Sequence, residues 1–458
     1  MNMSNKSTNP KGTKDYGPSE LLSIRFIINK IRNVFISFGY SEIETPSIEK
    51  RATLYEKYGD EGDKFIFNII NSGEKVKKAD IESLSAGKLN QFVSSISEKG
   101  LRFDLTVPLA RFVAQHFNKI NFPFKRFQIQ KVWRSDRPQR GRFQEFTQCD
   151  VDAIGSNSIL LEHEMIQIYS KVFRELGLKD VKIKINHRQI LNSIANKIGI
   201  SDSFNEFIVL IDKRDKIGSE KLKNLLRNDL NINDSHIDYL FELFEYSGKF
   251  SDLINKITNE FSDALSIKAA EEINKIYEMM ENSDELVEIE FDLSLARGLN
   301  YYTGIIYEVV APDSNIGSLG GGGRYSDLTK SFGVDNLPGI GISFGLERIH
   351  LLMDEKNLFP ELKVLSNDIL IINFDINFIN EIKNIIDGLR SHGRNVFVYP
   401  DSTKVSKQFS FADKNNFNFV IIYGQEEKDG DNIKIRLMDN GEERLFKLKN
   451  FIQEFSKM

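Results

Sequence analysis

Residues 124–154 constrain the fold more than any other segment of the chain. They are dense in residues that favour β-structure, and a charged turn with Gly and Pro at Ser135–Arg142 divides them into two halves. Two such halves around a turn predict a pair of long antiparallel strands. In the second half Gln148, Asp150 and Asp152 are two residues apart, so their side chains share one face of the sheet. We therefore expect an antiparallel sheet with one polar face.

The flanking patterns place this sheet inside an α+β core. Apolar residues three and four apart predict a helix over 19–38, and a second helix is expected over 160–176. Residues 71–99 are predicted as a polar surface excursion, and 339–353 as a strand that passes into a helix. Further strands are predicted at 65–70, 101–106, 181–186, 290–295 and 305–310.

Two other regions are expected to be distinct from this core. Residues 188–288 are predicted to be mostly helical, which makes them an insertion into a core of 11–187 and 289–354, behind a flexible tail at 1–10. After a polar linker at 355–366, residues 367–458 alternate strands and helices and predict a compact α/β domain. Its strands are expected at 368–374, 395–400 and 419–424, its helices near 376–391 and 404–415, followed by two strands and a terminal helix.

Composition excludes several classes of protein. Among 458 residues with a formal net charge of −5, Cys149 is the only cysteine, so no internal disulfide can form and a reducing compartment, the cytoplasm, is expected. The six histidines lack the spacing of a metal site, so zinc is not expected. No apolar stretch approaches the roughly 18 residues of a membrane span, and the polar N-terminus does not resemble a secretory signal.

The charge is unevenly distributed along the chain. Lys125–Arg142 carries seven basic residues against one acid, whereas Glu271–Asp292 carries nine acids against one lysine. Arginine suits bidentate contacts to phosphate, so the basic segment suits a polyanion. A solvated surface turn is the alternative for such a loop taken alone. The bulk charge therefore excludes only a non-specific nucleic-acid coat protein.

Polar residues in other predicted strands fit the same picture. Arg102, Asp104 and Thr106 are two apart, as in one face of a strand, and Arg297 follows a predicted strand directly. Acids and amides on strands, with arginines at the strand ends, fit a polar pocket on a sheet. The alternative is that these polar residues lie on two unrelated faces of the protein surface and form no pocket. Cys149 points to the face opposite Gln148, which favours a place in the core.

Six blocks of the sequence resemble motifs of the histidyl-tRNA synthetases, a family of class II aminoacyl-tRNA synthetases. The last two are similar to blocks peculiar to the histidine enzymes, and together the blocks cover nearly the whole chain in order. They are Lys11–Pro18 (KGTKDYGP), Phe38–Pro46 (FGYSEIETP, motif 1), Val132–Asp152 (motif 2), Gly339–Arg348 (GIGISFGLER, motif 3), Ala296–Tyr302 (ARGLNYY) and Gly320–Tyr325 (GGGGRY).

The resemblance implies a class II catalytic core with a helical insertion, a C-terminal anticodon-binding domain, and site residues. Arg134 and Arg297 would be catalytic, both near the ATP α-phosphate. ATP would be bound by Arg134, Arg142 and Arg348. Arg137 and Gln139 are candidates for contact with the tRNA acceptor end, and no residue is assigned to a metal. Histidine would be bound by Asp104, Thr106, Arg134, Gln148, Asp152, Arg297, Tyr301, Tyr302 and Tyr325.

The implied activity is that of a histidine–tRNA ligase. It would activate L-histidine with ATP to histidyl-adenylate and pyrophosphate, then transfer histidine to the 3′ adenosine of tRNA(His). ATP and its Mg²⁺ ion would be the co-substrates, and motif 1 implies a homodimer with no membrane partner. The rival is a synthetase-like regulatory subunit of histidine biosynthesis, which generally lacks the C-terminal domain and has a degraded form of the histidine-specific arginine block. Another class II synthetase is a third possibility, against which the ARGLNYY block argues.

Overall fold

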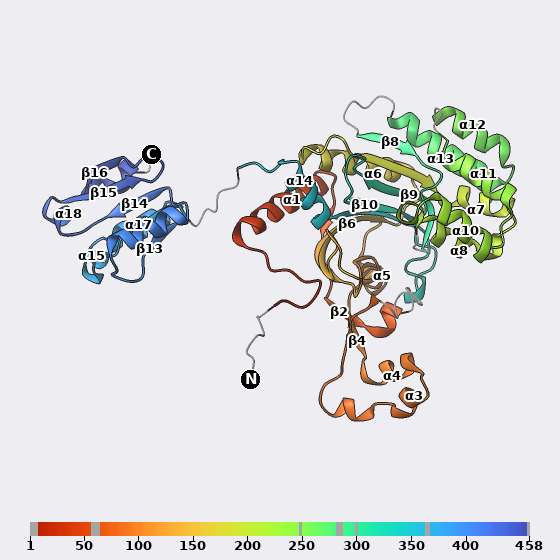
Figure 1. Ribbon diagram of the computed structural model, residues 1–458, viewed down its shortest axis with the longest axis horizontal. Helices are drawn as coiled ribbons and strands as arrows, with labels where there is room; N and C mark the ends of the chain where they lie inside the picture. The colour runs from red at the N-terminus through yellow and green to blue at the C-terminus, as the bar shows by residue number, and fades with distance from the viewer. Residues whose placement is uncertain are drawn as a thin grey trace. The chain divides into compact units, whose positions relative to one another are not determined.

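The computed structural model describes residues 8–55, 65–246, 250–280, 287–297, 301–361 and 367–455. The chain divides after Pro360 into two compact units, which are described separately below (Figure 1). None of the described helices is both long and apolar enough to cross a membrane.

An eight-stranded sheet forms the centre of the first unit (Figure 1). Strands β5 and β6 pair antiparallel along their full length, from Phe124 opposite Ile154 to Trp133 opposite Glu145, which confirms the predicted strand pair. The internal neighbours are all antiparallel, and only the edge strands β1 and β8 pair parallel. The order is β1 (Ser41–Glu42), β5 (Phe124–Trp133), β6 (Glu145–Ile154), β11 (Gly339–Gly345), β10 (Gly320–Tyr325), β9 (Tyr302–Val310), β7 (Lys182–His187) and β8 (Glu288–Phe291).

Three helices pack against one face of this sheet in the main hydrophobic core: α1 (Pro18–Ser37), α6 (Leu160–Glu175) and α14 (Leu346–Glu355). This core continues into the helices of residues 188–288. Helix α1 begins with proline, which is tolerated at the first helical position, and buries apolar side chains at spacings of three and four. Cys149, Val151 and Ala153 of β6 point into this core and are fully buried. The helices predicted at 19–38 and 160–176 are confirmed, as is the core position of Cys149. Alternation along β6 leaves Gln148, Asp150 and Asp152 on the other face.

A small three-stranded sheet carries a helical lobe, visible in orange at the bottom of Figure 1. The surface excursion predicted for residues 71–99 contains several short helices, and the strand predicted at 65–70 is reduced to two residues. The elements are β2 (Ile48–Lys50), β4 (Lys99–Leu101), β3 (Asn68–Ile69), η1 (Gly73–Lys78), α3 (Ile81–Ser85) and α4 (Leu89–Ile96).

The strand predicted at 101–106 is wrong. Strand β4 ends at Leu101, and Thr106 begins helix α5 (Thr106–Gln115), followed by η2 (Phe117–Lys119). The Asp104 carboxylate accepts hydrogen bonds from the backbone N–H groups of Thr106 and Val107, at 3.0 and 3.1 Å. Carboxylates that accept first-turn N–H groups stabilise helix starts, and this outweighs the β-propensity of the flanking residues. Arg102, Asp104 and Thr106 therefore do not share one face of a strand.

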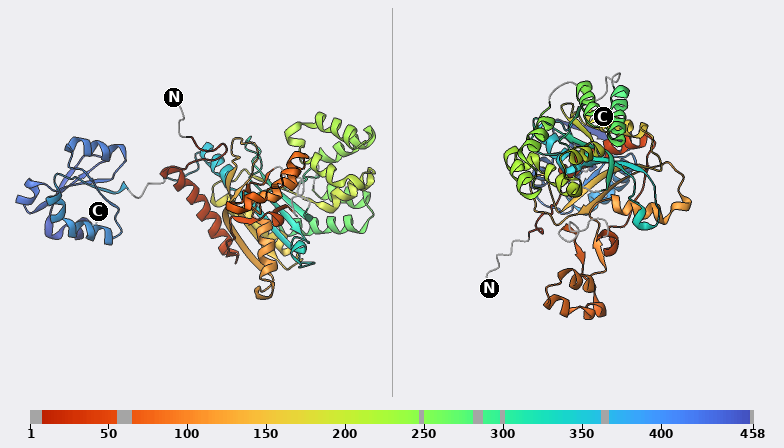
Figure 2. Two further views of the ribbon diagram at one scale, coloured as in Figure 1. Left: turned by 90° about the horizontal axis from the view of Figure 1, so that it is seen from below. Right: turned by 90° about the vertical axis from the view of Figure 1, so that its right-hand side faces the viewer.

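Helices α7 to α13, which we call the helical insertion, gather at one end of the sheet (Figures 1 and 2). Their predicted helical character is confirmed over the described residues, and residues 247–249 and 281–286 lie outside these. The strand expected at 290–295 is β8, two residues earlier. The helices are α7 (Arg188–Lys197), α8 (Phe204–Ile211), α9 (Arg214–Ile217), α10 (Ser219–Asp229), α11 (Asp234–Phe244), α12 (Phe250–Glu260) and α13 (Ala264–Met280), with η3 (Ser201–Ser203) after α7.

The second unit contains a five-stranded sheet with helices packed on it (Figure 2). A hydrophobic core lies on each face of this sheet. Strand β12 pairs parallel with both of its neighbours, and its three residues are all buried. The predicted strands and helices are present, and α18 was not anticipated. The strand order is β13 (Val396–Val398), β12 (Ile369–Ile371), β14 (Phe419–Ile422), β15 (Asn432–Leu437) and β16 (Glu443–Lys447); the helices are α15 (Ile376–Glu381), α16 (Lys383–Ser391), α17 (Val405–Lys414), α18 (Gln425–Asp429) and α19 (Phe451–Phe455).

Candidate active site

A cavity of about 540 Å³ lies on the polar face of the eight-stranded sheet. Strands β6, β9, β10 and β11 contribute its lining, together with the loops that precede α5 and β9. Arg137 and Gln139 are exposed and do not line it. All the other residues predicted for the site do: Asp104, Thr106, Arg134, Arg142, Gln148, Asp152, Arg297, Tyr301, Tyr302, Tyr325 and Arg348.

Asp152 is held rigidly at one end of the cavity. Its carboxylate accepts a hydrogen bond from the Tyr325 hydroxyl at 2.8 Å and forms an ion pair with Arg126 at 2.6 Å. Arg126 lies opposite Asp152 on strand β5 and is fully buried. Burial raises the pKa of the Asp152 carboxyl, while Arg126 and Tyr325 oppose that rise. Arg126 was counted only as part of the basic segment, and its inward position follows from the alternation of β5.

Asp150 is a second buried carboxyl in this wall, to which the sequence assigned no role. Burial raises its pKa to about 7, although Arg126 and a hydrogen bond with Ser343 act in the other direction. Its Oδ1 atom and the Oε1 atom of Gln148 are both buried without a hydrogen-bond partner among the described residues. Buried polar atoms are normally paired, so these two exceptions beside the cavity are a feature typical of functional sites. Asp150 lies two residues from both Gln148 and Asp152, and this spacing could have predicted its place in the cavity wall.

Three tyrosines form an aromatic wall beside these acids. The ring centroids of Tyr301 and Tyr302 are 4.6 Å apart, and Tyr325 meets Tyr301 edge-on at 6.4 Å. Burial raises the pKa of all three phenols, which are therefore uncharged hydrogen-bonding groups at neutral pH. Residues 298–300 of the ARGLNYY block lie outside the described residues.

Arginines surround the other end of the cavity. The Arg134 guanidinium lies over the ring of Phe103 at 4.3 Å and donates through Nε to the Phe103 carbonyl at 3.0 Å. Arg348 donates to the Ser318 carbonyl at 2.6 Å, and Arg142 forms an ion pair with Asp136. Burial lowers the pKa of Arg348, and the charges of Arg142, Arg134 and Arg297 lower it further. Such a concentration of cations is suited to an anion with several charges.

Arg297 lies directly above the glycine strand β10. Its Nη1 atom is 3.4 Å from the Tyr307 carbonyl oxygen and 3.9 Å from the Glu308 carboxylate, while its Nε has no partner among the described residues. A Cβ atom on Gly321 would lie 1.9 Å from Nη1. The run Gly320–Gly323 therefore allows the arginine to lie against the backbone of the sheet. Glu308 is a further lining residue that no sequence pattern indicated.

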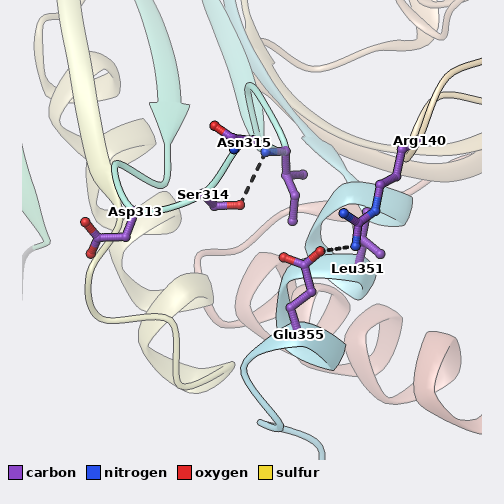
Figure 3. A pocket seen from close by; sticks show the side chains of 7 residues that line it. Arg140, Asp313, Ser314, Asn315, Leu351 and Glu355 are labelled. Atoms are coloured by element: carbon purple, nitrogen blue, oxygen red, sulfur yellow. Dashed lines mark hydrogen bonds and ion pairs between the residues drawn. The ribbon is translucent and has the colours of Figure 1, made fainter.

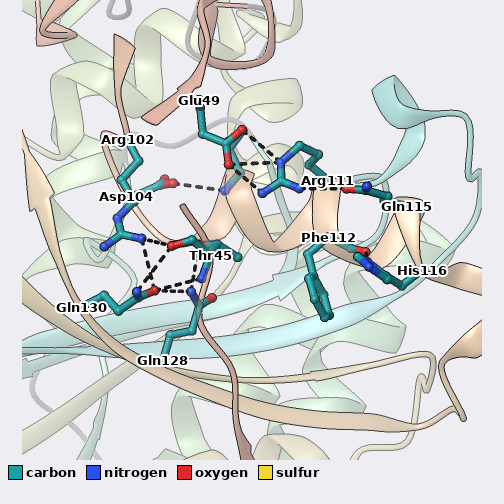
Figure 4. A network of polar contacts seen from close by, with 11 residues as sticks. Thr45, Glu49, Arg102, Asp104, Arg111, Phe112, Gln115, His116, Gln128 and Gln130 are labelled. Carbon is teal, nitrogen blue, oxygen red and sulfur yellow. Dashed lines mark hydrogen bonds and ion pairs between the residues drawn. The ribbon is translucent and has the colours of Figure 1, made fainter. Parts of the chain in front are cut away.

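A buried polar network lies under the site (Figure 4). Arg102 is 2% exposed and donates to the backbone carbonyls of Thr45 and Lys131, at 2.6 and 2.8 Å, and to the Gln130 side chain. It does not line the cavity. Arg102 thus connects the segment before β2 to strand β5.

The exposed loop between β5 and β6 lies against helix α14. Arg140 of this loop forms an ion pair with Glu355, beside a smaller cavity of about 240 Å³ (Figure 3). Gln139 and Arg142 exchange backbone hydrogen bonds of 3.0 and 2.9 Å, which close the loop into a tight turn. Arg137 and Gln139 are consequently presented to solvent.

Comparison with known proteins agrees with this geometry. The sequence model of the histidyl-tRNA synthetases matches residues 79–349, and that of the anticodon-binding domain matches residues 368–458. The chain is 45% identical to the histidine–tRNA ligase of Christiangramia forsetii, with 96% of this chain and 97% of the relative covered. It is 43% identical to that of Flavobacterium johnsoniae, over 96% and 97%.

Solved structures show the same fold. The histidyl-tRNA synthetase of Nostoc sp. PCC 7120 is similar with a TM-score of 0.77 and 26% identity, covering 99% of both chains. A Bacillus halodurans structure described as an ATP phosphoribosyltransferase regulatory subunit/histidyl-tRNA synthetase has a TM-score of 0.71 at 21% identity over 92% of this chain and 99% of that one, a likeness of fold alone.

A class II aminoacyl-tRNA synthetase core therefore surrounds the cavity, and the chain belongs to the histidyl-tRNA synthetase family. The regulatory-subunit alternative is not favoured, because the ligase relatives match nearly the whole chain and the C-terminal unit matches an anticodon-binding domain.

Proposed function

We propose that this chain is a histidine–tRNA ligase and that the cavity on the eight-stranded sheet is where it activates histidine with ATP. One observation carries the proposal: a single cavity joins a buried acid–tyrosine end, around Asp152 and Tyr325, to an end surrounded by arginines. The first end suits an imidazole and the second suits a triphosphate.

The acid–tyrosine end is suited to select histidine. Neutral imidazole carries one N–H donor and one acceptor nitrogen. The Asp152 carboxylate, fixed by Arg126 and Tyr325, accepts the N–H, and a tyrosine hydroxyl donates to the other nitrogen. A site that pairs both nitrogens rejects analogues without them by ~10⁴-fold or more. Asp104, Thr106 and Gln148 bind the remaining polar groups of histidine, the first two taking the α-amino group.

The arginines promote formation of the adenylate. A histidine carboxylate oxygen attacks the ATP α-phosphorus, the bond from that phosphorus to the bridging oxygen breaks, and pyrophosphate leaves with its electron pair. Such a step needs alignment and charge stabilisation more than a protein base. Arg134 and Arg297 bind the α-phosphate, Arg134 also binds the carboxylate, and Arg142 and Arg348 bind the remainder of ATP. Each contact to developing charge contributes about 2–4 kcal/mol.

Mg²⁺ enters with ATP as part of the substrate. This ion keeps several waters and binds mainly through substrate phosphates and one or two carboxylates. Glu308, which lines the arginine end, is a suitable carboxylate. Among the described residues, no three His, Cys, Asp or Glu side chains form a group that could hold a metal ion.

The remaining assignments concern tRNA(His) and assembly. Arg137 and Gln139 are presented by the exposed loop as contacts for the acceptor end, and residues 367–458 are the anticodon-binding domain. Residues 188–288 are an insertion domain, 355–366 a linker, and the motif 1 segment Phe38–Pro46 the dimer interface. The buried free thiol of Cys149 fits a reducing compartment such as the cytoplasm.

Amino-acid-dependent exchange of labelled pyrophosphate into ATP tests the proposal. Exchange is expected with histidine and with no other standard amino acid, and histidine should be transferred to tRNA(His). Exchange with a different amino acid, or none with histidine, would contradict it. The variant Asp152→Ala should raise the KM for histidine strongly and leave the KM for ATP nearly unchanged.

A further inference from the structure

Three side chains within Asn186–Gln189 hold the chain segment on which Arg297 lies: Asn186, Arg188 and Gln189. Asn186 is fully buried, and its Nδ2 donates to the carbonyls of Leu293 and Leu295, at 3.2 and 2.9 Å. Between β8 and Arg297 this segment has no regular secondary structure, so its carbonyls need side-chain partners.

Arg188 and Gln189 also donate side-chain hydrogen bonds to backbone carbonyls, one before and one after residues 298–300. Arg188 donates to the carbonyl of Arg297 itself at 3.2 Å, and Gln189 donates to the carbonyl of Thr303 at the same distance. Arg297 of the ARGLNYY block and Thr303, which follows the block directly, are thus held by adjacent residues at the start of one helix, α7.

Arg188 makes this contact from an unusual position. It is 5% exposed, lies over the ring of Phe204 at 4.8 Å, and forms no ion pair with a carboxylate among the described residues. Burial lowers its pKa to about 10, so it keeps its charge at neutral pH. Burying a cation without a counter-charge is costly, and here the charge is directed at the backbone of a proposed catalytic residue.

The helical insertion provides the base for these contacts. His187 accepts the backbone N–H of Gln189 through Nδ1 at 3.1 Å, and its Nε2 is 3.2 Å from the Glu272 carboxylate on α13. The first and last helices of the insertion are thereby joined at the turn that contacts the Arg297 segment.

We propose that Asn186–Gln189 is a positioning element that fixes Arg297 over β10, so that the helical insertion sets the rate of histidine activation. This inference rests on the proposed function of Arg297 in adenylation. Arg188 acts through Arg297 and does not itself contact the substrate. A displacement near 1 Å at a reacting group can reduce a rate about 100-fold, so the effect of losing the contact should be large.

A double-mutant cycle in pyrophosphate exchange tests the proposal in the full-length protein. Arg188→Gln should lower kcat by roughly 30- to 100-fold and change the KM for histidine less than about threefold. Arg188→Lys, which keeps the charge and loses the planar donor group, should fall between this variant and the wild type. In an Arg297→Ala background, Arg188→Gln should add less than about a twofold loss, because the guanidinium that Arg188 positions is already gone.

Ser193→Ala is the matched control, since Ser193 is buried in the same helix and bonds Asp263 within the insertion at 2.9 Å. It should leave kcat within about twofold of wild type. Gln189→Ala, at a half-buried position, provides a second test should Arg188→Gln not fold, and should lower kcat by about fivefold. Losses that multiply in the double variant, or an unchanged kcat in both single variants, would overturn the inference. Absence of exchange in the wild type would instead refute the proposed function.

Discussion

Strands β6 and β12 lie in the interior of the two sheets of this molecule, and they use their two faces differently. In β12, Ile369, Leu370 and Ile371 are buried between two apolar cores. In β6, apolar residues face a core on one side, while Asp150 and Asp152 face the cavity on the other. Each apolar CH₂ that is buried stabilises a fold by about 0.8 kcal/mol, whereas a buried polar atom without a partner costs about 1–3 kcal/mol.

This difference between β6 and β12 separates the residues that stabilise the fold from those that serve the reaction. Strand β12 gains stability from both faces, whereas Gln148–Asp152 of β6 gains it from one face and bears unpaired polar atoms on the other. Substitutions on the polar face of the catalytic sheet should therefore impair activity more than stability, and substitutions in β12 should do the reverse. The following predictions test this contrast in order of their expected effect on histidine activation.

Arg297→Ala should have the largest effect. We expect exchange to fall about 10²- to 10³-fold, with little change in the KM for histidine, because the contact strengthens as charge develops on the α-phosphate. The matched variant is Arg394→Ala in the C-terminal unit, where Arg394 pairs with Asp368 at 2.6 Å. That variant should melt earlier and keep normal exchange. Equal exchange losses in both would contradict the contrast.

Gly321→Ala should have nearly as large an effect without removing a functional group. The added Cβ would lie 1.9 Å from Arg297 Nη1, so the guanidinium must move, and we expect about a 100-fold loss of kcat. In Gly388→Ala the new Cβ would meet only the end of the Ile452 side chain, at 2.3 Å, which can turn away. Steady-state exchange should therefore be normal in that variant. Wild-type kcat in Gly321→Ala would refute the assigned position of Arg297.

Asp150→Asn should change the pH dependence of stability and alter exchange less than about tenfold. The pKa of Asp150 is raised from 3.8 to about 7 in the folded protein. Between these values the folded carboxyl keeps a proton that the unfolded one loses, so stability falls as the pH rises from about 4 to about 7.

Thermal unfolding at several pH values measures this effect. The wild type should lose up to about 4 kcal/mol of stability across that window through this group, and Asp150→Asn should abolish the loss. The exposed Asp387→Asn serves as the control and should follow the wild type. An unchanged pH slope in Asp150→Asn would show that this carboxyl is already ionised in the folded protein.

Ile371→Ala should have the smallest effect on histidine activation. Removing this fully buried side chain should destabilise the C-terminal unit by about 2–5 kcal/mol. Exchange with histidine should remain within about twofold of wild type, while charging of tRNA(His) should fall at temperatures where the unit unfolds. Calorimetry, the exchange assay and the tRNA-charging assay would measure these effects. A loss of exchange equal to the loss of charging would contradict the contrast between the two sheets.

Much of this arrangement could be predicted from the sequence, because it depends on short-range patterns. Alternation of Gln148, Asp150 and Asp152 predicted the polar face of β6, and apolar spacing predicted α1. The cavity lining at Arg297, Tyr301 and Arg348 came from resemblance to family motifs, since these residues are far apart in the chain.

The failures occurred where a tertiary or capping contact overrides propensity. The strand predicted at 101–106 was wrong because the Asp104 carboxylate accepts the first N–H groups of α5. Arg126 and Glu308 were missed because only the folded sheet brings them to the cavity region. The contacts of Asn186–Gln189 with the Arg297 segment join residues more than 100 positions apart, which no local pattern reveals.

A crystal structure with histidine and a non-hydrolysable ATP analogue tests the central claim most directly. We predict that one imidazole nitrogen lies within hydrogen-bond distance of the Asp152 carboxylate, and that the α-phosphate contacts both Arg134 and Arg297. A histidine side chain bound away from Asp152, or an α-phosphate that contacts neither arginine, would contradict the proposal that this cavity activates histidine.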